Sequence, residues 1–313
     1  MDPIDKINFA KDTTFGLLMA AQRADFQLFY SLQHQLFLTD GEPYAEMRPL
    51  KVFDDSNLWY SLGAFQSRPL SELSVVLMRK DPPFNNEYLY STYILEAAER
   101  RGCLVTNRPS SLRDCNEKIF ATDYPNCTPP LLVSSNQKHL KEFVLKHKDI
   151  VLKPLNGMGG MSIFRVKIND PNLSVILETL TNNGHQTIMA QRYIPEISAG
   201  DKRGLIVGGE VVPYCLARVP NENDFRGNLA AGGRGIVRPL SSKDNWIASQ
   251  VAADLMSRGL LLVGLDIIGE FLTEINVTSP TCVREIERET NLQICDQFIK
   301  VLEQQLCERV KQT

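Results

Sequence analysis

The sequence lacks the features that would direct the protein into a membrane or out of the cell. Its 313 residues contain no apolar run close to the ~20 residues of a membrane-spanning helix. The opening segment, Met1 to Asp5, has neither the basic nor the apolar region of a signal peptide. The seven cysteines are odd in number and form no Cys-x-x-Cys pair, which favours reduced thiols over disulfides or zinc. These absences predict a cytoplasmic protein.

A strong charge of either sign is also absent. The chain carries 34 Lys and Arg against 37 Asp and Glu, a net charge of −3, so we expect no nucleic-acid partner and no membrane partner. No internal repeat or low-complexity stretch occurs. The four histidines have neither metal-ligand spacing nor a nucleophile partner, and we interpret them as surface or structural residues.

Strands and helices alternate in the first third of the chain. The apolar run 74–78 is typical of a buried parallel strand. Residues 88–101 have a helical pattern that ends at Gly102, and residues 104–106 form another short apolar strand. A second helix is predicted to start at Pro109 and to continue through Phe120. This alternation predicts an α/β domain.

Two carboxylates and an amide stand in a strand-like stretch near the C-terminus. Glu274 and Asn276 are two residues apart, so their side chains share one face of a strand. Gly269-Glu270 lies between two apolar runs and indicates a hairpin turn. A three-residue loop or a bulge would place Asp266 opposite Glu274, giving the hard oxygen ligands that Mg²⁺ prefers. The alternative is an exposed hairpin whose polar side chains face water.

A glycine-rich turn, residues 156–162, follows the predicted strand 149–155. It has neither the Walker pattern nor the Rossmann spacing, and the chain resumes as a strand at Ile163. The turn is therefore expected to be a hairpin flap whose backbone amides close over phosphates, with Lys153 reaching a phosphate from the strand. A plain glycine hairpin is the alternative.

Arginines and lysines occur at the ends of other predicted strands. Arg203 and Arg218 fall on neighbouring strands and are suited to neutralising a transferring phosphoryl group, or else to surface ion pairs. Arg79 and Lys80 directly follow the apolar run 74–78, where α/β sheets bind ligands. The polar loop 221–234 is long enough to be a lid.

Together these motifs resemble the ATP-grasp ligases, and more closely the bacterial glutathione synthetases. The resemblance rests on Lys118, on residues 153–160, on Asp201-Lys-Arg203, and on Asp266 with Glu274-Ile-Asn276. Its most specific stretches are Arg79-Lys-Asp-Pro-Pro-Phe84, Ser111-Leu-Arg-Asp-Cys-Asn-Glu-Lys118, Asn228-Leu-Ala-Ala-Gly-Gly-Arg-Gly235 and Glu274-Ile-Asn-Val-Thr-Ser-Pro280.

The resemblance implies an α/β fold: an ATP-grasp fold preceded by a Rossmann-like, parallel-sheet N-terminal domain. The expected domains are a substrate-binding domain over 1–115, a central lid domain over 116–190, and a C-terminal domain with the metal site over 191–313. The implied reaction joins γ-glutamylcysteine to glycine with ATP, through an acyl phosphate. Mg²⁺ or Mn²⁺ would assist, and the family suggests a homotetramer.

The resemblance also implies a role for each matching residue. ATP would contact Lys118, Lys153, Gly157, Met158, Gly159, Gly160, Gln191, Arg192, Tyr193, Ile194 and Asp201. The metal ions would contact Asp266, Glu274 and Asn276, while Arg203 and Arg218 would steady the acyl phosphate. The expected substrate residues are Arg79, Lys80, Arg226, Asn228, Gly233, Arg234, Ser279 and Arg284.

The sequence departs from the family pattern in two places. Relatives usually have a short apolar strand ahead of the Met-Asp-Pro-Ile that opens this chain, and we hypothesise a misassigned start. Asn156 stands where relatives often have Asp, which weakens any metal role there. Two alternative functions stay open: another ATP-grasp ligase, such as a D-alanine–D-alanine or glutamate-adding enzyme, and a non-catalytic ATP-binding protein.

Overall fold

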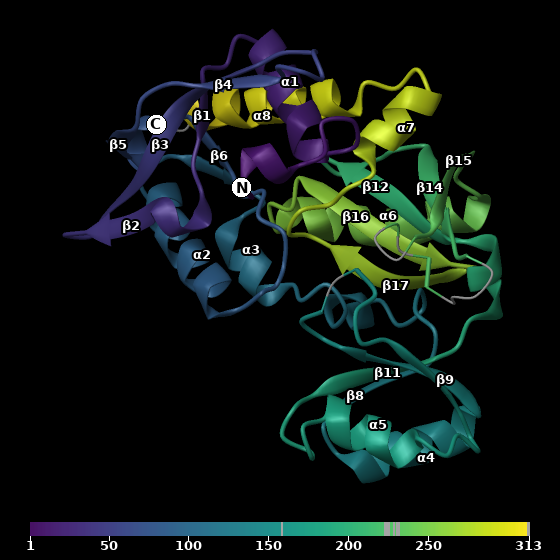
Figure 1. Ribbon diagram of the computed structural model, residues 1–313. Coiled ribbons are helices and arrows are strands. Elements are labelled where there is room, and N and C mark those ends of the chain that lie inside the picture. The colour runs from purple at the N-terminus through teal and green to yellow at the C-terminus, as the bar shows by residue number, and fades with distance from the viewer. Residues whose placement is uncertain (158, 222–225, 228, 230–231, 312–313) are drawn as a thin grey trace.

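The computed structural model describes residues 1–157, 159–221, 226–227, 229 and 232–311. Its strands form separate sheets in the N-terminal, central and C-terminal parts of the chain (Figure 1). The central sheet, with two helices on its outer face, projects from the rest of the molecule at the bottom of Figure 1. The mixed α/β fold predicted from the sequence is confirmed, whereas the division at residues 115 and 190 stays a prediction.

The N-terminal part combines a parallel pair of strands with an antiparallel sheet. Strands β6 (Val75–Leu77) and β7 (Leu104–Thr106) are parallel and are joined by helix α2 (Asn86–Glu99). The antiparallel sheet was not predicted. It is built on the long strand β3 (Glu42–Val52), which pairs with β1 (Leu28–Tyr30), β2 (Leu36–Thr39), β4 (Tyr60–Leu62) and β5 (Gln66–Pro69).

A cavity of about 490 Å³ lies beside β6. Its lining includes Val75, Val76 and Leu77 of β6, Leu18 of helix α1 (Thr13–Arg23), and Met1. The expectation of a further apolar strand ahead of Met1 stays a prediction.

Helix α3 (Pro109–Asp114) is shorter than the sequence predicted. It was expected to continue through Phe120, but Cys115 leaves the helical conformation. The Asn116 side chain then accepts hydrogen bonds from the backbone N–H groups of Lys118 and Ile119. An asparagine side chain that caps the following turn competes with helix continuation, so residues 116–118 form a turn that faces the centre of the molecule.

The central sheet has the antiparallel order β10-β9-β11-β8. Its elements in chain order are β8 (Leu131–Ser134), α4 (Gln137–His147), β9 (Asp149–Pro154), β10 (Phe164–Lys167), α5 (Leu173–Leu180) and β11 (Ile188–Arg192). Helices α4 and α5 bury Leu140, Val144 and Leu177 against the sheet. One face is therefore sealed, and the other face is left for the pocket. The antiparallel pairing of β9 with β10 confirms that the glycine-rich turn joins two strands of a hairpin.

The C-terminal sheet carries the hairpin that was predicted around Gly269-Glu270. Its strands are β12 (Asp201–Val207), β13 (Glu210–Val211), β14 (Tyr214–Val219), β15 (Arg234–Pro239), β16 (Leu262–Ile268) and β17 (Phe271–Asn276). Helix α6 (Ser242–Ser257) packs on one face and buries Ile247, Val251 and Leu255. Helix α8 (Ile294–Val310) packs beside α1, and α7 (Val283–Glu289) precedes it.

The β16–β17 hairpin has the register that the predicted metal site requires. Asp266 lies opposite Glu274, and Gly264 lies opposite Asn276. A bulge next to Asp266 supplies the extra residue, so that Ile267 pairs with Leu272. The alternation of side chains then places Asp266, Glu274 and Asn276 on one face of the hairpin.

Asn107, directly after β7, ties the N-terminal part to the open end of this hairpin. Its buried amide donates to the carbonyls of Leu262 and Val277 and accepts from the amides of Leu261 and Leu262. A buried side chain whose donors and acceptor are all used holds its partners firmly. Strands β16 and β17, which carry the predicted metal ligands, are therefore fixed on the side away from their turn.

Candidate active site

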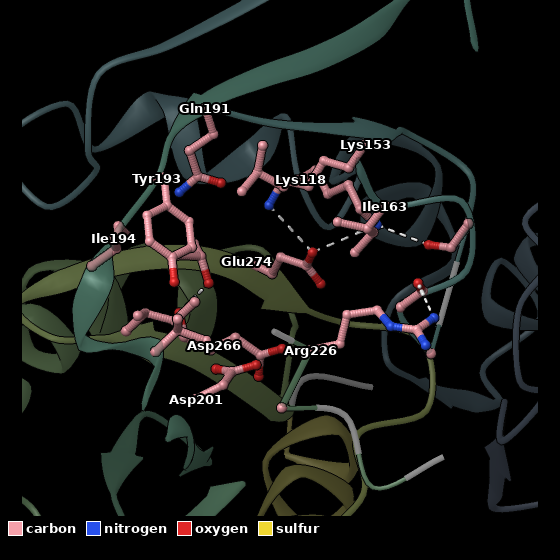
Figure 2. Close-up of a pocket in the computed structure, with 18 of the residues that line it drawn as sticks. Lys118, Lys153, Ile163, Gln191, Tyr193, Ile194, Asp201, Arg226, Asp266 and Glu274 are labelled. Carbon is pink, nitrogen blue, oxygen red and sulfur yellow. Dashed lines mark hydrogen bonds and ion pairs between the residues drawn. The ribbon is translucent and has the colours of Figure 1, made fainter. Parts of the chain in front are cut away.

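A pocket of about 110 Å³ lies between the central and C-terminal sheets (Figure 2). Its apolar lining residues include Val151, Ile163, Ile194, Ile197 and Ile268. Its charged lining residues include Lys118, Lys153 and Glu274, and the part of the pocket around these three is called the charged end. A pocket with both apolar and charged lining suits a ligand with a flat ring and an anionic tail.

Two lysines converge on one carboxylate at the charged end (Figure 2). The Nζ atoms of Lys153 and Lys118 lie 3.5 and 3.7 Å from Oε1 of Glu274. Both lysines are buried, and burial lowers the pKa of Lys153 although Glu274 opposes that shift. Two buried ammonium groups with a single carboxylate leave an excess of positive charge, which favours a polyphosphate in the pocket.

Asp266 also lines the pocket, and two arginines bind its carboxylate. Nε of Arg203 lies 2.6 Å from Oδ1, and a terminal nitrogen of Arg218 lies 2.9 Å from Oδ2. Burial alone would raise the pKa of Asp266, but the two guanidinium groups hold it well below its usual range. Arg218 also pairs with Asp201. Arg203 and Arg218 are thus brought together as predicted, although they do not line the pocket themselves.

Asp201 retains an unused oxygen. Its Oδ2 accepts from Arg218, while its buried Oδ1 has no hydrogen-bond partner. Burial raises its pKa to about 7, against the lowering effect of Arg218. Asp201 is part of the pocket wall, so this oxygen is placed to accept a hydroxyl of a bound molecule.

The predicted metal ligands fit a divalent cation by their chemistry. Asp266 and Glu274 face each other across the hairpin, and Asn276 shares their side of the sheet. Their donors are carboxylate and amide oxygens, which suit Mg²⁺ or Mn²⁺. Within the described ranges, no group of three or more His, Cys, Asp and Glu side chains gathers as a metal site. Two carboxylates with one amide remain compatible with an ion that is also held by phosphates.

The glycine-rich turn bends over the charged end of the pocket. Gly157, Gly159 and Gly160 line it, and the carbonyl of Gly157 accepts a hydrogen bond of 2.8 Å from Lys118. Arg226 of the polar loop donates to the carbonyl of Gly160 at 3.1 Å. The turn and the loop thus meet over the pocket. Met158 and Asn228, which were also predicted to be site residues, lie outside the described residues.

The residues predicted to border adenine lie at the strand end that was expected. Gln191, Arg192, Tyr193 and Ile194 line the pocket where β11 ends. The guanidinium of Arg165 lies 3.5 Å from the centre of the Tyr193 ring, and Arg165 in turn pairs with Asp149. These contacts fix the Tyr193 ring in the wall of the pocket.

Several predicted substrate residues are placed away from this pocket. Arg79 is buried and donates to Thr14 and to the carbonyl of Pro280, while Lys80 pairs with Asp2. Arg284 donates to the carbonyl of Phe9 and lies over the rings of Phe9 and Phe15. Gly233, Arg234 and Ser279 are also absent from its wall. The structure therefore does not gather these residues at the pocket.

Other lining residues were missed in the sequence. Ile163, Ile268 and Thr273 have no polar signature, so nothing in their local pattern marks them as part of a site. Glu117 stands inside the motif that ends at Lys118, but it was not given a role. Its carboxylate accepts a hydrogen bond of 2.7 Å from Thr278, two residues beyond Asn276.

Comparison with known families gives matches over nearly the whole chain. Residues 1–113 match the N-terminal domain of prokaryotic glutathione synthetase, and residues 117–291 match its ATP-grasp domain. The glutathione synthetase of Pseudomonas aeruginosa is 59% identical over 99% of this chain and 98% of its own length. That of Escherichia coli is 54% identical over 98% and 97%.

Solved structures share the fold at low sequence identity. The ATP-grasp ligase PsnB, complexed with a minimal precursor, superposes with a TM-score of 0.61 and 18% identity, covering 93% of this chain and 95% of PsnB. The macrocyclase MdnC from Microcystis aeruginosa gives 0.60 and 14%, covering 96% and 97%. The predicted ATP-grasp fold is confirmed. Among the described residues, no helix is long and apolar enough to cross a membrane.

Proposed function

This chain belongs to the prokaryotic glutathione synthetase family, and we propose how its pocket carries out the reaction of that family. The activity is ATP-dependent glutathione synthesis, a ligase reaction that joins γ-glutamylcysteine to glycine and releases ADP and phosphate. The observation that carries the assignment to this pocket is the pair of buried lysines around Glu274, on the metal-bearing hairpin.

ATP lies along the pocket with its adenine ring among the apolar side chains and its phosphates at the two lysines. The adenine ring enters the slot between Ile163 and Ile268, next to the strand end at Gln191 to Ile194. The free oxygen of Asp201 accepts from the ribose. The phosphates lie under the glycine-rich turn, where Lys118 and Lys153 meet their charge.

Shortening Ile163 to alanine is expected to raise the KM for ATP about tenfold and to change kcat less than about twofold. The ring loses apolar contact worth about 1–2 kcal/mol, and about 1.4 kcal/mol corresponds to a factor of ten. The measurement is initial rate against ATP concentration. Ile168→Ala serves as the control, since Ile168 is exposed and lies outside the pocket. Equal effects of the two substitutions would contradict this placement of the ring.

A divalent cation is required, as in ATP-grasp ligases generally, and we propose that it is Mg²⁺, with Mn²⁺ as a substitute. Asp266, Glu274 and Asn276 would hold it on the common face of the hairpin. The bound cation supplies Lewis-acid stabilisation of the phosphates. Arg203 and Arg218 keep Asp266 ionised and fix the position of its carboxylate.

The chemistry follows from the poor reactivity of a free carboxylate. The cysteinyl carboxylate of γ-glutamylcysteine attacks the γ-phosphorus of ATP, which forms an acyl phosphate and releases ADP. The glycine amine then attacks the acyl carbon, so that the C–N bond forms, the C–O bond to phosphate breaks, and the amine proton leaves. No protein nucleophile is needed, because positioning and charge neutralisation lower the barrier. The hydrogen bond from Arg226 to the carbonyl of Gly160 holds the loop against the glycine-rich turn and restricts the access of water to the acyl phosphate.

We further propose that the protein acts in the cytoplasm as a homotetramer, with only ATP and its two small substrates as required partners. The absence of a strong net charge argues against a nucleic-acid role. Light scattering coupled to size exclusion tests the assembly. A mass near four times the 35.3 kDa of one chain supports the tetramer, and the mass of one chain contradicts it.

ADP release with γ-glutamylcysteine and glycine, each omitted in turn, tests the proposed substrates. Release that requires both, together with a product of the mass of glutathione, supports the proposal. D-alanine and glutamate are offered separately as substrates of rival ligases. Comparable release with D-alanine alone, or no release with any pair while ATP still binds, would contradict it.

A further inference from the structure

One side chain on the pocket face of the central sheet has no role in the reaction outlined above. Arg165 of β10 lies opposite Val151 of β9, and Val151 lies opposite Gln191 of β11. Residues directly opposite each other in a sheet point to the same face, and Val151 and Gln191 both line the pocket. The side chain of Arg165 is therefore on the pocket side of the sheet, away from helices α4 and α5.

Two partners fix the guanidinium of Arg165. Its Nε and a terminal nitrogen donate to the two carboxylate oxygens of Asp149, at 3.0 and 2.6 Å. A pair of parallel hydrogen bonds orients the plane of the guanidinium as well as its position. In this orientation Cζ of Arg165 lies 3.5 Å from the centre of the Tyr193 ring. The cation therefore stacks closely on the aromatic face, an arrangement that a planar guanidinium favours.

Asp149 also holds the backbone of Tyr193. The Tyr193 amide donates to the carbonyl of Asp149 at 3.0 Å. The main chain of Tyr193 is thus anchored by Asp149 directly, and its ring is anchored by Asp149 through Arg165. Tyr193 follows the last residue of β11 and lines the pocket beside Ile194, where the adenine ring is proposed to bind (Figure 2). The orientation of the Tyr193 ring therefore sets part of the wall next to the base.

Strand β10, which carries Arg165, lies at the edge of the central sheet. It follows the glycine-rich turn, so it forms one side of the flap hairpin. A short strand at the edge of a sheet is held by a ladder on one side and opens more easily than a central strand. The Arg165 side chain reaches across β9 to the ring that follows β11. It thereby ties the edge strand to the next strand but one.

We propose that Arg165 is a positioning residue for nucleotide binding, which holds the Tyr193 ring and the flap strand β10 in one arrangement. The inference rests on the proposed function, because it takes the ligand of the pocket to be ATP. Arg165 acts through Tyr193, since it lies next to the pocket wall rather than in it. When Arg165 is absent, the ring and the strand become ordered only as the nucleotide binds, and that ordering weakens the affinity. The transfer of phosphate takes place at Lys118 and Lys153, so its rate depends little on Arg165.

Arg165→Met removes the guanidinium and keeps a long side chain at this position. We expect the dissociation constant of ADP with Mg²⁺, measured by calorimetry, to rise about threefold to tenfold, the range of one cation–aromatic contact. The KM for ATP is expected to rise by the same factor. At saturating ATP, kcat and the KM values for γ-glutamylcysteine and glycine should change less than about twofold, whereas misfolding would impair all of them. Lys167→Met is the matched control, because Lys167 is exposed on the same strand.

Tyr193→Leu tests whether Arg165 acts through the ring. In a Tyr193→Leu background, adding Arg165→Met is expected to change the ADP dissociation constant less than about twofold, because the partner of the guanidinium is already gone. An unchanged ADP affinity in Arg165→Met, losses that multiply in the double variant, or a fall in kcat as large as the rise in KM would each overturn the inference. If ADP binding responds as expected but the unsubstituted protein makes no glutathione, the proposed function fails and the role of Arg165 in nucleotide binding stands. If the unsubstituted protein binds no ADP, both fail.

Discussion

Replacing Glu274 by glutamine is expected to lower kcat about 1,000-fold at saturating ATP. The carboxylate is the proposed ligand of the metal ion, and Lys118 and Lys153 both approach it. Lewis-acid stabilisation of the phosphates is worth several kcal/mol, and each ~1.4 kcal/mol corresponds to a factor of ten in rate. The neutral amide also leaves two buried ammonium groups without their carboxylate.

The measurement is the initial rate of ADP release at increasing Mg²⁺ concentration. We expect the half-saturating Mg²⁺ concentration to rise together with the loss of kcat. Glu270→Gln is the matched control, because Glu270 is exposed in the turn of the same hairpin. A Glu274→Gln protein that keeps its rate within tenfold and its Mg²⁺ dependence unchanged would show that this carboxylate is not part of the metal site.

Replacing Asp266 by asparagine is expected to lower the free energy of unfolding by about 3–5 kcal/mol. One carboxylate oxygen of Asp266 accepts a hydrogen bond from Arg203, and the other oxygen forms an ion pair with Arg218. All three side chains are buried. With asparagine, two buried guanidinium groups share only Asp201, which pairs with Arg218. The remaining positive charge has no water to solvate it, so the cost exceeds that of a lost surface pair.

Unfolding by urea, followed by circular dichroism, measures this loss. The control is Asp296→Asn, which breaks the exposed pair with Arg23 and is expected to cost less than about 1 kcal/mol. We also expect the stabilisation by Asp266 to depend on pH. Its folded pKa lies below that of the unfolded chain, so the contribution is complete above the unfolded value near 3.8 and is lost as the pH falls toward the folded value. Equal losses in the two variants would contradict a buried charge network.

The local pattern predicted the register of the β16–β17 hairpin because the constraints on that register are local. The two-residue spacing of Glu274 and Asn276 fixes their common face, and only a longer loop or a bulge brings Asp266 opposite Glu274. The structure contains that bulge. Lys153 and the flap were predictable for the same reason, since strand, turn and strand follow one another in the chain.

The features that could not be predicted depend on contacts between segments that lie far apart in the sequence. The carboxylate of Glu117 accepts a hydrogen bond from Thr278, 161 positions away, and no spacing in the sequence indicates this contact. Arg284 was expected among the substrate residues. It lies over the rings of Phe9 and Phe15, which come from the other end of the chain. The antiparallel sheet around β3 was missed because its partner strands are short and contain polar residues.

The central claim is that this pocket transfers phosphate to a substrate carboxylate before the amine attacks. The most direct test uses γ-glutamylcysteine labelled with ¹⁸O in its cysteinyl carboxylate, together with ATP, Mg²⁺ and glycine. If an acyl phosphate forms, the carboxylate oxygen that attacked the γ-phosphorus leaves with the phosphate, and mass spectrometry finds one ¹⁸O in the inorganic phosphate for each glutathione made. Unlabelled phosphate, with both labelled oxygens retained on carbon or lost to water, would contradict the account.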